Sequence, residues 1–173
     1  MAGRTPSQTI GPYYRYGLRW TDAGNVGFAE TGKKVVITGR VFDGAGATVD
    51  DALIETWQRG PANTSPAPAS GGSNPHGFGR ADTLNGGTFR IETLMPGGPL
   101  PSIDVTIFAR GLLKALRTRV YLAPEADVRA DPLLAPLANS PRVKTLIAVP
   151  AGDSEYRWDV RLQGEGETVF FAF

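Results

Sequence analysis

The strongest constraint on the fold is a two-residue alternation of apolar and polar side chains. In residues 88–94 (TFRIETL), Phe89 and Ile91 share one face and charged or polar side chains share the other. Residues 102–108 (SIDVTIF) and 156–162 (YRWDVRL) repeat the pattern. Successive side chains of a strand point to opposite faces, so this alternation is typical of a half-buried β-strand.

Weaker candidates of the same kind bring the predicted strands to eight. Gly, Pro, Asp or Asn bounds each one, and the chain holds 22 Gly and 14 Pro, which supply many turns. The added stretches are residues 34–42, 52–58, 116–122, 143–149 and 167–173. Many short strands separated by turns predict an all-β fold, an antiparallel β-sandwich of two packed sheets. At 173 residues a single domain is expected.

Three segments fall outside this pattern. One short helix is predicted within residues 124–138, where Pro124 suits a first helical position and Pro132 would end the turn. Residues 43–51 resemble a glycine-rich hairpin loop. Residues 59–80 form a long loop of Pro, Gly, Ser and Ala, and loops of this length are either functional or mobile. The sequence leaves both interpretations open.

The N-terminal stretch TPSQTIGPYYRYGL, residues 5–18, has an unusual composition. It is too polar and too interrupted by Pro and Gly for a core strand or a helix, yet it gathers Tyr13, Tyr14 and Tyr16. Terminal segments are poorly ordered unless something holds them. These tyrosines therefore predict packing against another surface.

Composition excludes several classes of function. The 18 basic and 17 acidic residues give a net charge of +1 without long runs, so no binding of nucleic acid is expected. The absence of cysteine excludes disulfides and thiolate metal sites and suits a reducing compartment. No apolar run approaches about 18 residues, and no signal-peptide pattern opens the chain. A cytoplasmic protein without membrane contact is expected.

Few residues offer catalytic chemistry. His76 is the one histidine and sits among Asn, Pro and Gly, which favours a surface or loop-packing role over a metal ligand. Asp43, Asp50 and Asp51 lack the spacing of a calcium loop and are interpreted as solvated turn residues. Glu165 and Glu167 suggest an acid pair for hydrolysis, but charged residues leading into a last strand explain them better.

Arg110 has two interpretations of equal weight. In FARG, residues 108–111, it follows an apolar strand, so its guanidinium can emerge at the rim of a sandwich. A planar fork of donors suits two-point binding of a carboxylate. An ion pair with a surface acid is the alternative.

Five stretches in order along nearly the whole chain carry a family resemblance. They are TPSQTIGPYY, ALIETWQ, HGFGR, IFARG with TRVYL after it, and RLQGEGETVFFAF. With them the chain resembles the intradiol ring-cleaving dioxygenases that act on protocatechuate, and within that family the α chains. The resemblance implies a β-sandwich, a β-chain partner and an assembly of several α–β protomers. It also implies a non-haem Fe(III), held in the β chain by two tyrosines and two histidines, that cleaves protocatechuate with O₂ between its hydroxyls.

The resemblance also implies that this chain holds no iron. The catalytic chain's His-Ile-His strand matches Ser102, Ile103 and Asp104 here, and no tyrosine lies between Tyr16 and Tyr121. One histidine cannot supply two imidazole ligands, so the chain is interpreted as the non-catalytic partner. The loop at 59–80 then resembles a remnant of a metal-site loop.

The family implies a role for the N-terminus in the partner's substrate cavity. Residues 1–30 are expected to form an arm and interface segment and residues 31–173 the sandwich domain, with Tyr14 and Tyr16 as anchors on the other chain. The compressed stretch 95–101 predicts a differently shaped cavity rim. By the resemblance, the substrate-binding residues are Thr9, Gly11, Pro12, Tyr13 and Arg110.

Two other classes of function are alternatives to a dioxygenase subunit. A stand-alone sandwich that binds carbohydrate or protein would use Trp20, Trp57 and Trp158 as stacking platforms, although the last two lie in alternating strands typical of a core. A hydrolase based on Glu165 or Glu167 lacks a second group at a matched position.

Overall fold

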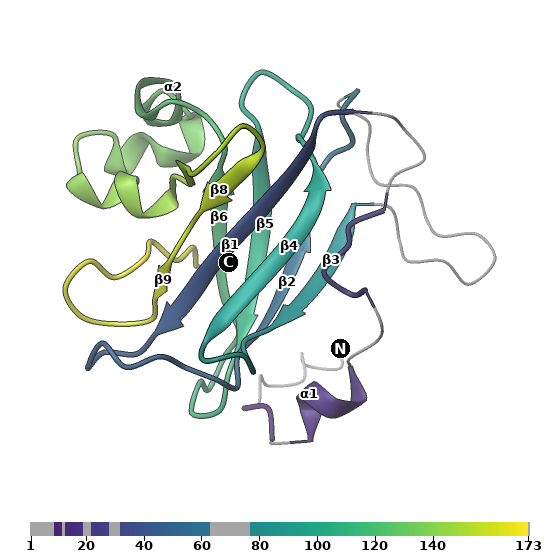
Figure 1. Ribbon diagram of the computed structural model, residues 1–173. Coiled ribbons are helices and arrows are strands. Elements are labelled where there is room, and N and C mark those ends of the chain that lie inside the picture. The colour runs from purple at the N-terminus through teal and green to yellow at the C-terminus, as the bar shows by residue number, and fades with distance from the viewer. Residues whose placement is uncertain (1–8, 12, 19–21, 28–31, 63–76, 173) are drawn as a thin grey trace, which may run out of the picture.

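The structure of the chain is a computed structural model that describes residues 9–11, 13–18, 22–27, 32–62 and 77–172. Its strands form two sheets that face each other, with short helices beside one end of the sandwich and a one-turn helix at the opposite end (Figure 1). The predicted all-β sandwich is confirmed. The division at residue 30 stays a prediction.

The first sheet is built around the longest strand. The strand order is β4 (Thr88–Leu94), β1 (Lys34–Phe42), β8 (Glu155–Arg157) and β7 (Val149–Pro150), with β9 (Val160–Arg161) also beside β1. β1 and β4 pair antiparallel, from Lys34 opposite Leu94 to Arg40 opposite Thr88. β8 and β9 run parallel to β1, which differs from the wholly antiparallel expectation.

The predicted strand at 156–162 is divided between β8 and β9. At the break, the Trp158 amide donates to the Thr38 carbonyl at 2.9 Å, and the Arg40 amide donates to Asp159 Oδ1 at 3.0 Å. A Cβ on Gly39 would overlap the Trp158 carbonyl oxygen. Glycine at this position therefore permits the close approach of the last strands to β1.

The second sheet is antiparallel throughout. Its order is β3 (Phe78–Asp82), β2 (Leu53–Trp57), β5 (Ser102–Phe108) and β6 (Leu116–Tyr121). The bounds of β5 match the predicted 102–108. β3 is a strand that the sequence interpretation left inside the loop at 59–80, because its glycine and charged residues obscure the alternation.

Two clusters of buried side chains form the interior. The larger lies between the sheets and takes alternate residues from each, including Ile37, Ile54, Ile91, Val105 and Trp158. The smaller lies under the helical segments and includes Tyr121, Val128, Leu134, Val143 and Leu146. The helical segments thus extend the core past the end of the second sheet.

The described residues contain four short helices, of which two lie in the stretch where one was predicted. They are α1 (Tyr14–Gly17), α2 (Glu125–Arg129) and the 3₁₀ helices η1 (Pro132–Leu137) and η2 (Pro141–Leu146). Pro124 is the N-cap of α2, and Pro132 begins η1 rather than ending a helix. The one-turn α1 lies in the stretch that was expected to be too polar for a helix.

The strand predicted at 143–149 is wrong. Most of it belongs to η2, which Ser140 caps by accepting from the Arg142 amide at 3.2 Å. Val143 and Leu146, three residues apart, are the buried side chains of η2. An apolar run without strict alternation did not distinguish a strand from a tight helical turn.

Residues 167–172 are likewise not a strand, although backbone hydrogen bonds hold them. The Thr168 amide donates to the Arg161 carbonyl at 3.0 Å and the Phe171 amide to the Arg117 carbonyl at 2.8 Å. The described C-terminal segment therefore connects β9 to the free edge of β6.

Residues 22–27 bridge the edges of the two sheets. The amide of Arg80 in β3 donates to the Ala23 carbonyl at 2.7 Å, and the amide of Glu92 in β4 donates to the Gly24 carbonyl at 2.8 Å. This segment joins the N-terminal region to the sandwich.

Helices in the described ranges are all too short or too polar to cross a lipid bilayer.

Candidate functional site

Two candidate regions lie at opposite ends of β5. Ile103, Val105 and Ile107 face the core, so Ser102, Asp104, Thr106 and Phe108 face outward on the second sheet. Ser102 and Asp104 border a cavity at the beginning of the strand. Phe108 contacts α1 at its end.

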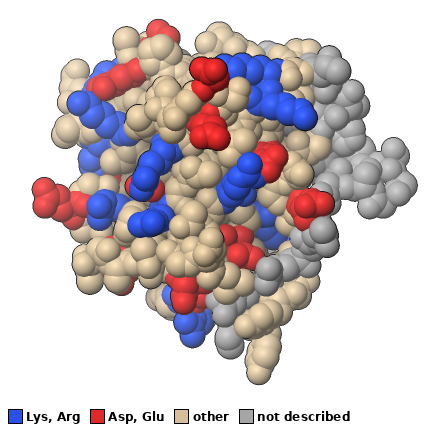
Figure 2. Space-filling model, in the orientation of Figure 1, with Lys and Arg blue, Asp and Glu red and all other residues tan. Residues whose placement is uncertain are grey.

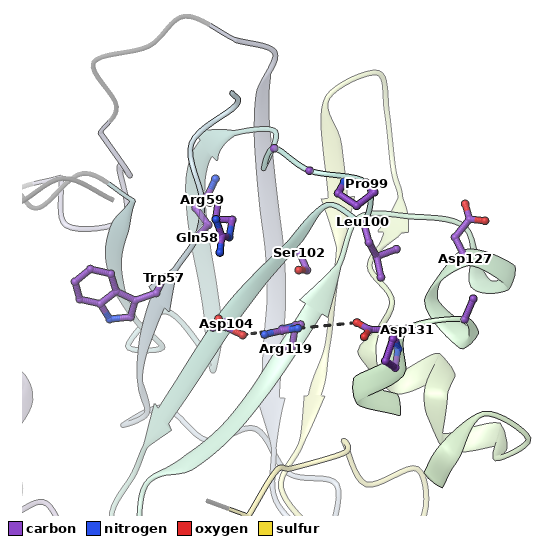
Figure 3. Close-up of a pocket in the computed structure, with 14 residues that line it drawn as sticks. Trp57, Gln58, Arg59, Pro99, Leu100, Ser102, Asp104, Arg119, Asp127 and Asp131 are labelled. Atoms are coloured by element: carbon purple, nitrogen blue, oxygen red, sulfur yellow. Dashed lines mark hydrogen bonds and ion pairs between the residues drawn. The ribbon is translucent and has the colours of Figure 1, made fainter. Parts of the chain in front are cut away.

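The strand-end cavity has a volume of about 860 Å³. Its walls are residues 57–59 at the end of β2, residues 97–100 before β5, Arg119 of β6 and part of residues 127–132 (Figure 3). Gln58 lines this cavity, and two hydrogen bonds hold its side-chain amide in place. The amide donates to the Leu94 carbonyl at 2.9 Å and accepts from Thr93 Oγ1 at 2.8 Å.

Arg119 lies between two carboxylates in this cavity (Figure 3). Its Nε donates to Asp104 Oδ1 at 2.7 Å, and its Nη1 lies 4.0 Å from Asp131 Oδ2. Burial opposes the charged guanidinium, but the hydrogen bond and charge of Asp104 outweigh that effect and raise the Arg119 pKa. The cavity therefore contains a cation supplied by the chain itself.

Tyr121 is held neutral beside this pair. Its side chain is fully buried, and its hydroxyl donates to Asp131 Oδ2 at 2.7 Å. Burial, and then the hydrogen bond to Asp131, raise the pKa of Tyr121 to about 12. Asp131 also accepts from the Leu133 amide at 2.9 Å as the N-cap of η1, so its carboxylate is fully engaged.

These residues do not fit a ferric ion. Ser102 and Asp104, the two positions expected from the resemblance to match iron-binding histidines, carry a hydroxyl and a carboxylate, and that carboxylate already binds Arg119. A tyrosinate ligand must lose its proton, whereas Tyr121 uses its proton to bind Asp131. Among the residues that the structure describes, no group of three or more His, Cys, Asp or Glu side chains could hold a metal ion.

The end of β5 at Phe108, where α1 packs, is here called the arm end. The residues assigned to substrate binding belong to the segment around α1 and to the loop after β5. The Tyr14 ring packs on Phe108 with 5.5 Å between centroids, which places α1 on this chain's own sheet. Tyr14 is thus partly buried against its own chain, and its role as an anchor on another chain stays a prediction. Thr9 and Gly11 are exposed, and Tyr13 is 81% exposed. Pro12 lies outside the described residues.

Arg110 follows β5 by two residues, where Gly111 takes a positive φ of 83° that suits the turn. Its side chain is 62% exposed, and its Nε pairs with the nearly buried Asp51. The hydrogen bond that Arg110 donates to the Asp51 carboxylate raises the Arg110 pKa. The ion-pair interpretation thus holds in the isolated chain. A substrate role stays a prediction.

The alternative aromatic platforms differ from one another. Trp158 is buried and its Nε1 donates to the Thr145 carbonyl at 2.9 Å, so it is a core residue. Trp57 is 43% exposed, packs on Phe78 at 4.7 Å between ring centroids and turns away from Arg119 (Figure 3). Trp20 and His76 lie outside the described residues.

The acidic candidates have structural partners or face solvent. Asp43 accepts from the Ala45 and Ala47 amides at 2.9 Å each, as a turn residue does. Glu167 pairs with Arg142 at 2.9 Å, and Glu165 is exposed. No observation in the described chain joins the two glutamates as an acid pair.

Arg119 and Asp131 were missed as members of one site. The alternation of Arg117, Arg119 and Tyr121 along the predicted strand places them on one face, which was an available signal. Asp131 precedes a helical turn outside that strand, so the spacing of residues along the sequence does not predict how close it lies to Arg119.

Charge is well mixed on the surface. On the face in Figure 2, Lys and Arg alternate with Asp and Glu, and neither sign forms a continuous field over the described residues there. This agrees with the near-zero net charge of +1.

Comparison with known proteins gives a consistent family. The chain is 38% identical to the protocatechuate 3,4-dioxygenase alpha chain of Pseudomonas putida, covering 98% of this chain and 96% of that one. It is 39% identical to the corresponding alpha chain of Burkholderia cepacia, with coverage of 97% and 96%. The beta chain from Burkholderia cepacia is 26% identical over 79% of this chain and 67% of its own length. No family model matches the sequence.

Solved structures agree on the fold. An intradiol ring-cleavage dioxygenase from Tetranychus urticae superposes with a TM-score of 0.61 at 16% identity, covering 92% of this chain and 94% of that one. At this identity the similarity concerns the fold alone.

Proposed function

Because the chain belongs to the family of protocatechuate 3,4-dioxygenase alpha chains, within the intradiol dioxygenases, we propose that it is a non-catalytic subunit. Its partner is a β chain that carries Fe(III), and several α–β protomers assemble into the enzyme. The α chain completes the substrate cavity of that partner. The relative named as a beta chain supports a partner of related sequence.

The observation that carries the non-catalytic role is the Arg119 network. An internal cation between Asp104 and Asp131, beside a neutral Tyr121, uses the groups that a metal would need. Removing Arg119 would leave Asp104 without this ion pair, while Asp131 would keep only the Tyr121 hydroxyl and the Leu133 amide as partners. These groups are already engaged in an ion-pair network, which supports a chain that holds no iron of its own.

The contribution to substrate binding is assigned to the arm end. Thr9, Gly11, Pro12 and Tyr13 would line the mouth of the partner's cavity, and Arg110 would lie at its rim. Protocatechuate carries a carboxylate, and hydroxyl donors with a guanidinium suit that group. The exposure of Tyr13 and of the Arg110 side chain supports this assignment, because both are available to a partner.

The reaction proposed for the assembled enzyme is oxidative ring cleavage. The partner's Fe(III) would activate the catechol, and both atoms of O₂ would enter between its hydroxyl-bearing carbons to give 3-carboxy-cis,cis-muconate. This places the enzyme in aromatic catabolism through the β-ketoadipate pathway. A cytoplasmic location stays a prediction.

Expression with and without the β chain tests the proposal. We expect the isolated chain to bind no iron, to show no dioxygenase activity and to aggregate through its exposed interface. Coexpression with the β chain should give an active complex that contains both chains. Stoichiometric iron with the burgundy ferric-tyrosinate absorption in the isolated chain would refute the non-catalytic role.

A further inference from the structure

Arg80 of β3 and Glu55 of β2 form a cross-strand pair on the outer face of the second sheet. The two residues lie directly opposite each other in the register of the strands. Arg80 Nε donates to Glu55 Oε1 at 3.0 Å, and Nη2 contacts the same oxygen. Their side chains are only 13% and 17% exposed, so each charge depends on the other.

The same guanidinium reaches the N-terminal arm. Arg80 Nη1 donates to the carbonyl of Leu18 at 3.0 Å, and Leu18 is the C-cap of α1. The last carbonyls of a helix have no partner within it, so an external donor is well placed there. One side chain therefore joins β2, β3 and the end of α1.

Tyr14 strengthens this junction from the other end of α1. Its ring packs on Phe108, while burial, and then the charge of Glu55, raise the Tyr14 pKa. Glu55 and Arg80 therefore lie close enough to Tyr14 to influence its charge, and Arg80 in addition contacts Leu18. Without these contacts, a single helical turn has little stability of its own.

We propose that Arg80 is a positioning residue that fixes α1 on the sandwich and thereby aims Thr9, Gly11 and Tyr13 at the partner's substrate cavity. A lysine cannot replace it, because one ammonium cannot span Glu55 and the Leu18 carbonyl with the geometry of a planar fork. The effect on substrate rests on the function proposed above, whereas the attachment of the arm does not.

The test compares Arg80→Lys with a matched control, Arg129→Lys, in the coexpressed α–β enzyme. Arg129 makes the same kind of bridge elsewhere: its Nε donates to Glu125 at 2.9 Å and its Nη1 to the Ser140 carbonyl at 3.1 Å. The first measurement is the rate of trypsin cleavage after Arg15 and Arg19, followed by mass spectrometry. The second is KM for protocatechuate, with kcat and iron content.

We expect Arg80→Lys to speed cleavage of the arm by about three- to tenfold, the effect of losing about one hydrogen bond. KM should rise by up to the same factor while kcat and iron content stay unchanged. Glu55→Gln, which keeps the Arg80 donor to Leu18, should have a smaller effect. Arg129→Lys should leave both measurements at the level of the unmodified enzyme.

Each other outcome has a definite meaning. Unchanged cleavage in Arg80→Lys overturns the proposal and leaves the function of the α chain untouched. Faster cleavage with unchanged KM keeps Arg80 as the anchor of the arm and refutes the arm's role in substrate binding. If Arg80→Lys prevents assembly, or if Arg129→Lys has equal effects, Arg80 serves general stability and the positioning role is wrong.

Discussion

The two ends of β5 differ in how far their side chains find partners within the chain. At the beginning of the strand, Arg119 pairs with Asp104 and lies 4.0 Å from Asp131 at the strand-end cavity, and Asp131 also accepts from the buried Tyr121 hydroxyl. At its end, α1 packs on Phe108 but leaves Tyr13 81% exposed, and the nearby loop leaves Leu113 78% exposed. The comparison indicates that the cavity is internally complete, whereas the arm end needs a surface outside this chain.

This difference separates stability from activity. Substitutions in the cavity should change the free energy of unfolding and leave catalysis by the assembled enzyme intact. Substitutions at the arm end should do the reverse. The family resemblance by itself does not say which region governs stability and which governs activity, because the stretches that resemble the family include residues of both regions.

The largest effect is expected from Asp131→Ala. This change removes the N-cap of η1 and leaves the buried Tyr121 hydroxyl without its acceptor, so the free energy of unfolding should fall by about 2–4 kcal/mol. Urea denaturation of the isolated chain, at a protein concentration low enough to keep it monomeric, would measure it. Tyr121→Phe, which removes one hydrogen bond and leaves Asp131 capped, should cost about 1 kcal/mol. Equal, negligible losses in both variants would contradict the account of a tightly coupled cavity.

Alkaline pH should weaken the same end of the molecule. The unfolded chain releases the Tyr121 proton near pH 10, but the folded chain keeps it until about pH 12. The stabilisation is therefore complete below pH 10 and is lost as pH rises from 10 to 12, with a slope of at most about 1.4 kcal/mol per pH unit. Denaturation curves between pH 9 and 12 should show a shallower fall for Tyr121→Phe. Parallel curves for the two proteins would exclude Tyr121 as the source.

Deletion of residues 1–13 should act mainly on the substrate. KM for protocatechuate in the α–β enzyme should rise by about tenfold, equivalent to about 1.4 kcal/mol, with iron content unchanged. The sandwich should still fold, because β1 to β9 and both buried clusters lie beyond the deletion. Steady-state kinetics and circular dichroism would test the two expectations. If assembly and KM both stay unchanged, the arm is only a tail.

The smallest effect is expected from Arg110→Ala. A partly exposed guanidinium at the rim should raise KM for protocatechuate by roughly two- to fivefold and leave iron content intact. Arg157→Ala, which removes an exposed ion pair with Asp159, is the matched control and should leave KM unchanged. An unchanged KM in Arg110→Ala would assign the residue to its ion pair with Asp51.

The long strands could be predicted from sequence because apolar and polar residues alternate strictly in them. The helical turns and the strand break could not be predicted, because their backbone is irregular. β1, β4 and β5 have the predicted bounds because each buries one face only. The stretch at 143–149 is apolar without that constraint and became η2. The strand predicted at 156–162 is interrupted at Trp158, whose carbonyl lies close against Gly39 of β1. This contact joins distant segments, so the sequence around Trp158 does not predict it.

The candidate site was predictable in part for similar reasons. Arg110 could be placed at a strand end from its own segment. The Arg119 network joins β5, β6 and η1, and the Arg80 bridge joins β2, β3 and α1, so both depend on contacts between segments far apart in the sequence. Spacing along the chain carries little information about such contacts.

The segment at 22–27 limits how this chain can join others. Its carbonyls and amides occupy backbone groups of β3 and β4, and the Phe171 amide similarly occupies the Arg117 carbonyl on β6. A strand edge whose hydrogen-bonding groups are taken cannot template the addition of a foreign strand. At the bonded positions of those three edges, association would therefore proceed through side-chain surfaces, whose shape and chemistry discriminate between partners more sharply than a repeating backbone does.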